Sequence, residues 1–240
     1  MGDDVVMDKQ PEPHEGLETM AFFVESFAGL VPFVGNAITA TVVPALQKRH
    51  AERMRVWLDE LAAEMENLKI DKQALLTDDE FFYVLTEATK AAANTAHTEK
   101  LVFLQNAILN CANVESRPQD ELSLRFVKLI DEMSPAHLQL MEYFDSPRSW
   151  FDSKSPRMLP EGPIAQHELA LLAMGWKKAE RRRIDWLMED LTMWRMLGMV
   201  DRDELPVSDQ LVRRNITDQG RTFLSFIRDS ESDLTYPSEL

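Results

Sequence analysis

Residues Arg182 to Ile227 contain the pattern that decides the fold of the C-terminal half. The stretch begins Ile184-Asp185-Trp186-Leu187-Met188-Glu189-Asp190-Leu191 and continues through Trp194 to Leu197-Gly198-Met199-Val200; after a polar turn comes Ile216-Thr217-Asp218-Gln219-Gly220-Arg221-Thr222-Phe223-Leu224. Its first part has helical spacing and is followed by a glycine, a residue that commonly ends helices. The apolar residues on each side of the turn predict two short strands. Thr217 then predicts the N-cap of a last helix.

The composition of the whole chain favours a helical globular protein. Its 240 residues suffice for one large or two smaller domains, each with its own core. Hydrophobic residues make up 45% and charged residues 28%, which is ordinary for a folded protein. There are 8 glycines and 13 methionines, so a turn-rich β fold is disfavoured. We therefore predict a mainly α fold.

The net charge of −15 restricts the classes of partner. A surface this acidic repels nucleic acid and anionic lipid unless a basic patch overrides the repulsion locally. Acidic residues concentrate at both ends, so we expect residues 1–14 to be a disordered tail and residues 229–240 a solvated tail. The acidic N-terminus does not resemble a signal peptide, and the single Cys111 has apolar neighbours that predict a buried thiol. Both features suit a cytoplasmic protein.

Residues 19–47 form an unusually apolar segment with one charged residue, Glu25. Proline and glycine interrupt the segment, so two short helices describe it better than one membrane span. We interpret this hairpin as part of a buried core. Insertion at a membrane surface, with the protein peripheral to the bilayer, is the alternative, because a basic run follows directly. The hairpin residues that either interpretation uses are Phe22, Phe23, Phe27, Leu30, Val31, Phe33, Val34, Ile38, Val42 and Val43.

Residues 15–115 are predicted to form a helical bundle. Pro44 to Leu68 has an amphipathic pattern, with Met54, Leu58, Leu61, Met65 and Leu68 on one side and Trp57 beside them. Thr77 to Glu80 has the spacing of a capping box, so its acidic residues are explained by a helix start without a metal ion. Further apolar stripes predict helices that start near Thr77 and Thr95.

A domain boundary is predicted at residues 115 and 116, before Pro118. Helices are expected from Gln119 to Met133, after Ser134-Pro135, and from Gln166 to Met174 with its end at Gly175. Four Pro and Gly residues within 152–163 predict a long loop between the last two.

From Ser134 onwards the chain resembles a winged helix-turn-helix module of the kind found in bacterial regulators. The resemblance places the first helix after Ser134, the second at Gln166–Met174 and the third at Glu180–Leu197. The wing strands would be Met199–Val200 and Leu211–Ile216, and Thr217–Ile227 would be the last helix. The resemblance implies a winged-helix-like module over 116–228 with a small two-stranded β wing, and it covers none of the first 112 residues.

In DNA-binding members of this class the third helix enters the major groove and basic wing residues touch the backbone. The residues that could contact nucleic acid or another anion here are Lys177, Lys178, Arg181, Arg182, Arg183, Arg213 and Arg214. Residues 177–183 carry a net charge of +4, but the third helix adds Asp185, Glu189 and Asp190 with only Arg195 to offset them. Affinity for DNA depends on neutralising phosphates, so this module favours protein contacts.

No catalytic constellation is visible in the sequence. The five histidines are scattered, and glycine-rich phosphate loops, paired cysteines and nucleophile elbows are absent. We therefore expect no enzyme, no cofactor, no metal and no small-molecule ligand. The sequence predicts a regulatory or interaction protein that contacts a protein partner or itself. The alternatives are a membrane-associated effector acting through residues 19–47 and a DNA-binding transcriptional regulator.

Overall fold

The computed structural model describes residues 43–68, 70, 72–75, 77–115, 117–119, 122–154, 159–160, 162–199 and 204–228. The chain divides into two compact units, residues 1–70 and 71–240. This division differs from the boundary predicted at residues 115 and 116. The two acidic tails and most of the apolar segment 19–47 lie outside the described residues, so their predictions stay predictions.

Helix α2 (Val43–Asn67) makes up nearly all of the described part of the first unit. Met54, Trp57, Leu61 and Met65 are buried at steps of three and four, as the predicted amphipathic pattern requires, whereas Leu68 of the predicted stripe is 37% exposed. On the solvent-exposed side of the helix, Arg55 forms ion pairs with Glu52 and Asp59, both at 2.8 Å. No helix among the described residues has both the length and the apolar character needed to cross a bilayer. Of the hairpin residues only Val43 is described, as the first residue of α2.

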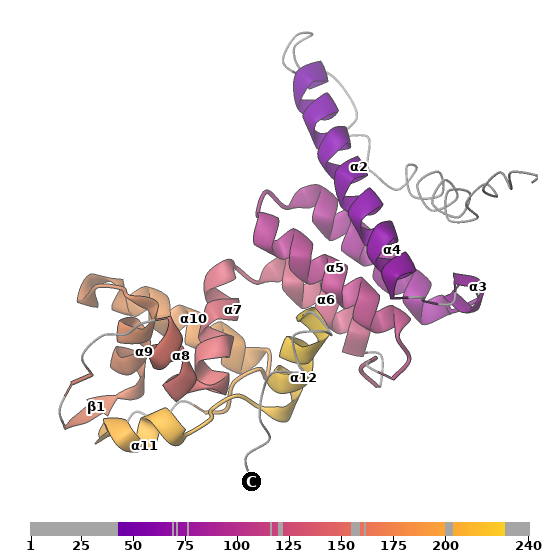
Figure 1. The fold of residues 1–240 in the computed structure, drawn as a ribbon. Helices are drawn as coiled ribbons and strands as arrows, with labels where there is room; N and C mark the ends of the chain where they lie inside the picture. The colour runs from indigo at the N-terminus through magenta and orange to yellow at the C-terminus, as the bar shows by residue number, and fades with distance from the viewer. Residues whose placement is uncertain are drawn as a thin grey trace, which may run out of the picture. The chain divides into compact units, whose positions relative to one another are not determined.

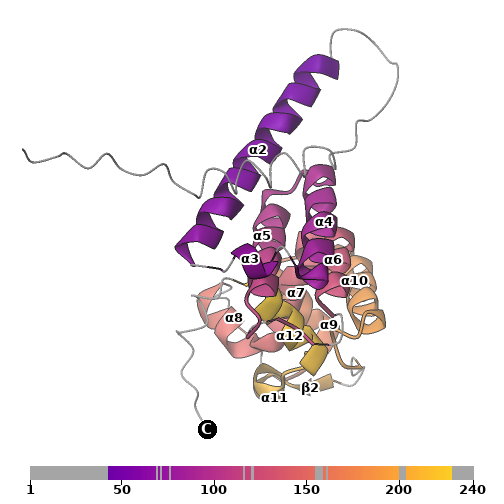
Figure 2. The ribbon, with the colours of Figure 1, turned by 90° about the vertical axis from the view of Figure 1, so that its right-hand side faces the viewer.

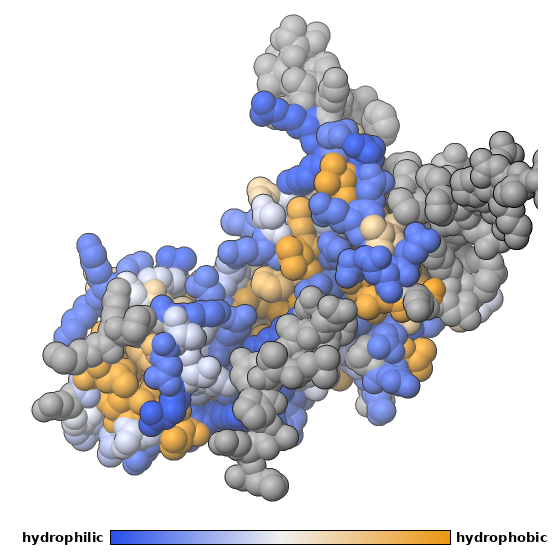
Figure 3. All heavy atoms as spheres, in the orientation of Figure 1, coloured by the Kyte–Doolittle hydropathy of each residue, from blue (hydrophilic) through white to orange (hydrophobic). Residues whose placement is uncertain are grey.

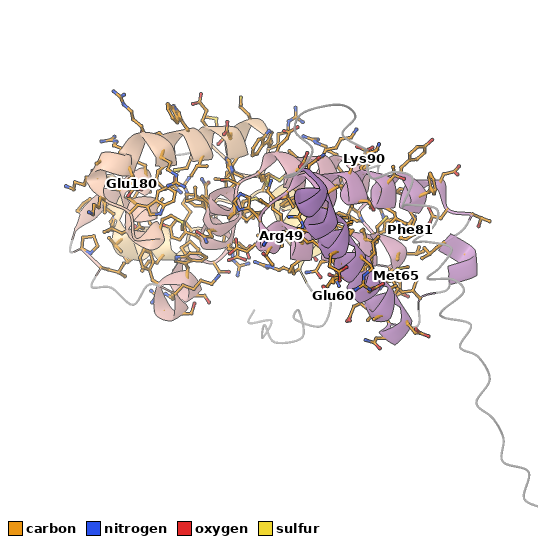
Figure 4. All side chains as sticks on the ribbon, turned by 90° about the horizontal axis from the view of Figure 1, so that it is seen from above. Arg49, Glu60, Met65, Phe81, Lys90 and Glu180 are labelled. Carbon is orange, nitrogen blue, oxygen red and sulfur yellow. The ribbon has the colours of Figure 1, made fainter. Side chains whose placement is uncertain are left out.

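The second unit begins with a group of helices that pack side by side (Figures 1 and 2). They are α4 (Asp79–Asn94), α5 (Thr98–Ala112) and α6 (Leu122–Glu132), and the short helix α3 (Lys72–Leu75) precedes them in the chain. Helix α4 packs against both α5 and α6, and small buried alanines such as Ala88 and Ala92 allow close approach. Phe81, which is labelled in Figure 4, is buried at the start of α4.

The predicted capping box at Thr77 is wrong by one residue. Asp78 is the N-cap of α4, because its carboxylate accepts a hydrogen bond from the Phe81 amide at 3.0 Å. The Thr77 hydroxyl instead donates to the Ala74 carbonyl at 3.1 Å. Asp78 also accepts from Arg117 at 2.6 Å, so the residue that begins the helix also binds the segment after α5.

Five more helices and a small sheet form the next part of the same unit. They are α7 (Pro135–Asp145), α8 (Pro147–Ser153), α9 (Gln166–Met174), α10 (Arg181–Met193) and α11 (Val207–Val212), with the 3₁₀ turn η1 (Lys178–Glu180) before α10. Ser134 caps α7 and Gly175 ends α9 in the left-handed region, both as predicted. Helices α7, α9 and α10 pack against one another. Apolar side chains gather around α8, β1 and α11 in the view of Figure 3.

The small antiparallel sheet is present, but its strands differ from the predicted wing strands. It pairs β1 (Pro163–Ala165) with β2 (Glu204–Pro206). Leu211 and Val212 belong to α11, because Val207 and Leu211 are buried four residues apart, which is helical spacing. Ile216 forms only an isolated bridge with Leu197.

The predicted end of the third helix also differs. Helix α10 stops at Met193, before Leu197, and Gly198 does not end it. Arg195 takes the left-handed conformation (φ 62°) that glycine usually supplies after a helix. Its amide donates to the Thr192 carbonyl and the Met196 amide to the Leu191 carbonyl, so these two bonds satisfy carbonyls at the helix end.

The last helix, α12 (Asp218–Ile227), begins at Thr217 as predicted. The Thr217 hydroxyl accepts from the Gly220 amide at 2.9 Å. Helix α12 lies against α5 (Figure 2), and Phe223 and Phe226 contact Phe126 of α6 with ring centroids 5.2 and 5.7 Å apart. The C-terminal helix therefore completes the core of the helices that come first in this unit.

Asparagines of α5 cap the far end of α12. The Asn106 side chain donates to the Ile227 carbonyl at 3.0 Å, and Asn110 donates to the carbonyls of Phe226 and Arg228, both at 2.9 Å. Carbonyls at a helix end have no partner within the helix, so buried donors that reach them stabilise the end.

Candidate interaction surface on α10

Helix α10 separates a buried face from an exposed face. Ile184, Leu187, Met188 and Leu191 are buried at helical spacing where α10 packs on α7 and α9. In Figure 4 the helix runs along one side of the second unit with a row of side chains pointing away from it; Glu180 is labelled near its start. The sequence pattern of this helix therefore fixes which residues meet solvent.

The exposed face carries two large apolar side chains. Trp186 is 67% exposed and Met193 is 68% exposed. They are seven residues apart, so they lie on the same side of the helix two turns apart. Arg182 and Glu189 lie on this side at helical spacing from Trp186 and are also exposed. We call Arg182, Trp186, Glu189 and Met193 the α10 face.

The first five basic residues predicted as anion contacts are brought together on η1 and the first turn of α10. All five are exposed: Lys177, Lys178, Arg181, Arg182 and Arg183. Two of them have partners nearby. Arg183 lies 3.7 Å from the Glu180 carboxylate and over the Trp176 ring, and Arg181 lies 3.9 Å from the Asp185 carboxylate. Part of the charge of this run is therefore balanced within the helix.

The other basic candidates lie on a different element. Arg213 and Arg214 follow α11, which packs on α8 and β2, so they do not extend a wing hairpin. Arg195, predicted to add positive charge to the third helix, lies beyond its end in the left-handed turn. Within α10 the acidic residues Asp185, Glu189 and Asp190 therefore follow a basic first turn.

His137 joins the start of α7 to α10. Its Nδ1 accepts from the Ser134 backbone amide at 2.9 Å, and its Nε2 lies 3.3 Å from the Asp190 carboxylate. We infer from these partners that the proton is on Nε2, which donates to Asp190. Burial lowers the pKa of His137, and the bond to Asp190 opposes that shift only in part.

Ser134, His137 and Asp190 together resemble a serine, histidine and aspartate triad, but their bonding fits a structural role. The Ser134 hydroxyl lies 3.0 Å from Nδ1, the same nitrogen that the backbone amide of Ser134 already occupies. A general base needs that lone pair to take the serine proton. The arrangement caps a helix, which is a structural role for His137.

Other groups that could carry chemistry have structural surroundings. Cys111 is buried, as predicted, and burial raises the pKa of its thiol to about 12, so thiolate chemistry is suppressed near neutrality. The buried Lys100 ammonium donates to the Asp131 carbonyl near the end of α6 at 2.6 Å. The described residues contain no group of three or more His, Cys, Asp and Glu residues placed to hold a metal ion.

The exposure of Trp186 and Met193 is a feature that the sequence analysis missed. The signal was present, because both lie opposite the buried stripe of Ile184, Leu187, Met188 and Leu191 on a helical projection. By contrast, the bonds from Asn106 and Asn110 to α12 join residues more than a hundred positions apart. No local pattern predicts such pairs.

Comparison with known proteins gives no family. No family model, curated protein or solved structure matches this chain. The winged-helix resemblance therefore depends on the chain's own residues and element order.

Proposed function

We propose that this protein is a non-catalytic regulatory or interaction protein whose winged-helix-like part, α7 to α12, binds another protein through the α10 face. The full order is α7, α8, β1, α9, α10, β2, α11 and α12. The helices α7, α9 and α10 with the β1–β2 pair support the resemblance, whereas α8 and α11 are additional to a winged helix. The observation that carries the functional proposal is the exposure of Trp186 and Met193 on α10, which takes the place of the groove-reading helix in the winged-helix resemblance.

An exposed tryptophan on this helix supports a protein partner. Tryptophan and methionine are enriched at protein interfaces, and tryptophan is frequent among the residues that contribute most to binding. The side chains beside them, Arg182 and Glu189, have opposite charges, as at the polar rim of an interface. A helix that enters the major groove of DNA lies between two phosphate backbones, so its exposed side chains would need to be neutral or positively charged.

DNA binding is the second candidate, because the run from Lys177 to Arg183 is exposed. Its weakness is electrostatic: Asp185 and Glu189 follow directly on the same helix. If DNA binding were the function, duplex DNA would be retarded at low salt, and binding would weaken steeply as salt rises. No retardation at low ionic strength would exclude it.

Membrane association through residues 19–47 is the remaining alternative. It stays a proposal, since this segment lies outside the described residues apart from the start of α2. Flotation of the intact protein with liposomes tests it, and Val34→Asp should abolish flotation while leaving the helical circular dichroism unchanged. A loss of the folded state instead would favour a buried hairpin.

The proposed function can be tested by site-specific photocrosslinking in cells. A photoreactive phenylalanine derivative at position 186 should form a covalent adduct with a protein. The matched control is position 212, because Val212 is 70% exposed on α11 and lies outside the α10 face. An adduct at position 186 that is absent at position 212 supports the proposal. No protein adduct at position 186, or equal labelling at both positions, would contradict it.

A further inference from the structure

The charges of the α10 face reverse along the helix. Arg182 precedes Trp186 by about one turn, and Glu189 follows it by about one turn. Neither Arg182 nor Glu189 forms an ion pair with another described residue, whereas Arg183 and Asp190 contact Glu180 and His137. The face therefore offers one available positive charge and one available negative charge on opposite sides of a tryptophan.

We propose, building on the proposed function, that the protein bound by this face is a second copy of the same chain. The two α10 helices would lie antiparallel across a two-fold axis that passes beside Trp186. Such an axis places the same patch on both subunits, so every contact occurs twice. The two Trp186 side chains then meet at the centre of the interface, where residues that contribute most to binding are usually found.

The spacing of the face fits this arrangement. At about 1.5 Å of rise per residue, Arg182 lies roughly 6 Å before Trp186 and Glu189 roughly 4.5 Å after it. In an antiparallel pair, Arg182 and Glu189 of the partner subunit therefore lie at nearly the same height along the helix axis, with an offset of roughly 1.5 Å. Met193 would lie beside the turn η1 of the other subunit, which precedes α10 and contains the small, exposed Ala179.

The alternative orientation is disfavoured by charge. Parallel helices, related instead by a two-fold axis along their length, would set Arg182 against Arg182 and Glu189 against Glu189, and like charges that face each other destabilise an interface. The net charge of −15 also opposes any broad contact between two copies. A small contact around alternating charges avoids most of that repulsion.

The size of the face predicts a weak dimer. One helix pair buries less than the 1,200 to 2,000 Å² that is typical of stable complexes, so a dissociation constant of roughly micromolar is expected. Because the Arg182–Glu189 pairs would lie at the rim, added salt should weaken the dimer.

Charge reversal of the full chain, followed by sedimentation equilibrium, tests the pairing. Arg182→Glu and Glu189→Arg should each weaken the dimer more than about tenfold, because each creates two like-charge pairs. The double variant should restore dimerisation, since the pairs re-form with opposite sense. Arg181→Glu is the matched control: it makes the same charge change beside the face, next to Asp185, and should leave the dimer nearly unchanged.

Cysteine crosslinking tests the axis independently. Trp186→Cys should form an intersubunit disulfide on mild oxidation, because the axis brings position 186 against itself. Arg182→Cys should not, since that position faces the other end of the helix. The native Cys111 should not interfere because it is buried.

The possible outcomes separate this inference from the proposed function. A photocrosslink at position 186 to a different protein, with a wild-type chain that stays monomeric at high concentration and low salt, would overturn self-association and leave the proposed function standing. A dimer unaffected by either charge reversal would overturn the assignment to the α10 face. No adduct of any kind at position 186 would overturn both. Restoration by the double variant together with the position-186 disulfide would establish the antiparallel dimer.

Discussion

Gly220 shows how closely the start of α12 approaches the end of α10. A Cβ atom at this position would lie 2.3 Å from the Met196 carbonyl oxygen and 2.7 Å from Ile216 Cγ1. The Thr217 amide donates to the same carbonyl at 3.0 Å, so the backbone there cannot easily move away. Packing therefore explains why a glycine follows Ile216 and Thr217 at position 220.

Gly220→Ala should lower the free energy of unfolding by about 2–3 kcal/mol, because the added methyl group overlaps backbone atoms. Urea denaturation followed by circular dichroism measures the change. Gly198→Ala is the control: its nearest contact would be the Asn215 side chain at 3.1 Å, which has more freedom to adjust. Equal losses in the two variants would mean that the close approach at Gly220 is not what limits stability.

The buried neutral His137 should make stability depend on pH. Burial lowers its pKa in the folded protein below the usual value of about 6.5, so the unfolded chain takes up the proton first as the pH falls. The contribution of neutral His137 is therefore present above about pH 6.5 and is lost as the pH falls below it. Protonation at Nδ1 would also break the bond from the Ser134 amide.

Urea unfolding at about pH 7.5 and about pH 5.5 should show lower stability at the acid value, and His137→Gln should make this dependence flatter. The glutamine does not titrate, while its amide can still donate to Asp190. If the free energy of unfolding changed equally with pH in the wild type and the variant, the pH dependence would belong to other groups.

At the scale of elements, the start of α4 depends on the residues that follow α5. Arg117 donates to the Cys111 carbonyl at 2.7 Å and to Asp78 at 2.6 Å, and its side chain is only 14% exposed. Burial alone would raise the pKa of Asp78, but its hydrogen bonds from Arg117 and the Phe81 amide outweigh burial and lower it.

Arg117→Met should cost about 1–3 kcal/mol of stability, a range reduced from that of fully buried pairs because water reaches both partners. It should also raise the pKa of Asp78, which NMR titration of the carboxyl group would detect. The stability that Asp78 contributes is present above its unfolded pKa of about 3.9 and is lost below it, so the variant should differ least from wild type in strong acid. Arg55→Met, on the exposed surface of α2, is the control and should show little change.

The elements differ in how far the sequence could predict them. The apolar stripe of α2, the N-cap Ser134 of α7, all of α9 and the N-cap Thr217 of α12 follow from local spacing and capping residues. The strands do not, because three-residue strands such as β1 and β2 are too short to show alternation. The end of α10 was misplaced because an arginine takes the conformation that sequence rules assign to glycine.

At the scale of the whole molecule, the second unit joins both sides of the predicted boundary at residues 115 and 116. Helix α12 packs on α5, and Asn110 reaches across 116 positions of sequence to the Phe226 carbonyl. The candidate site could be predicted only in part. The basic run that contains Arg182 was visible in the sequence, whereas the exposure of Trp186 and Met193 became clear only when the buried face of α10 was known.

We expect residues 116–228 expressed alone to lose the cooperative unfolding transition of the intact chain, since Phe223 and Phe226 would keep Phe126 but lose α5. Residues 71–228, which keep the described part of the second unit, should unfold cooperatively. Differential scanning calorimetry compares the two fragments. A sharp transition of the shorter fragment would show that 116–228 is an independent domain after all.

The capping of α12 by α5 also has a consequence for synthesis. Because translation proceeds from the N-terminus, Asn106 and Asn110 leave the ribosome well before the carbonyls that they bind. At about 5–20 residues per second, the 116 positions between Asn110 and Phe226 correspond to a delay of roughly 6–23 seconds. During that delay the surface of α5 that later receives α12 is open to chaperones, and a ribosome that stalls before residue 218 leaves a chain that cannot close its core.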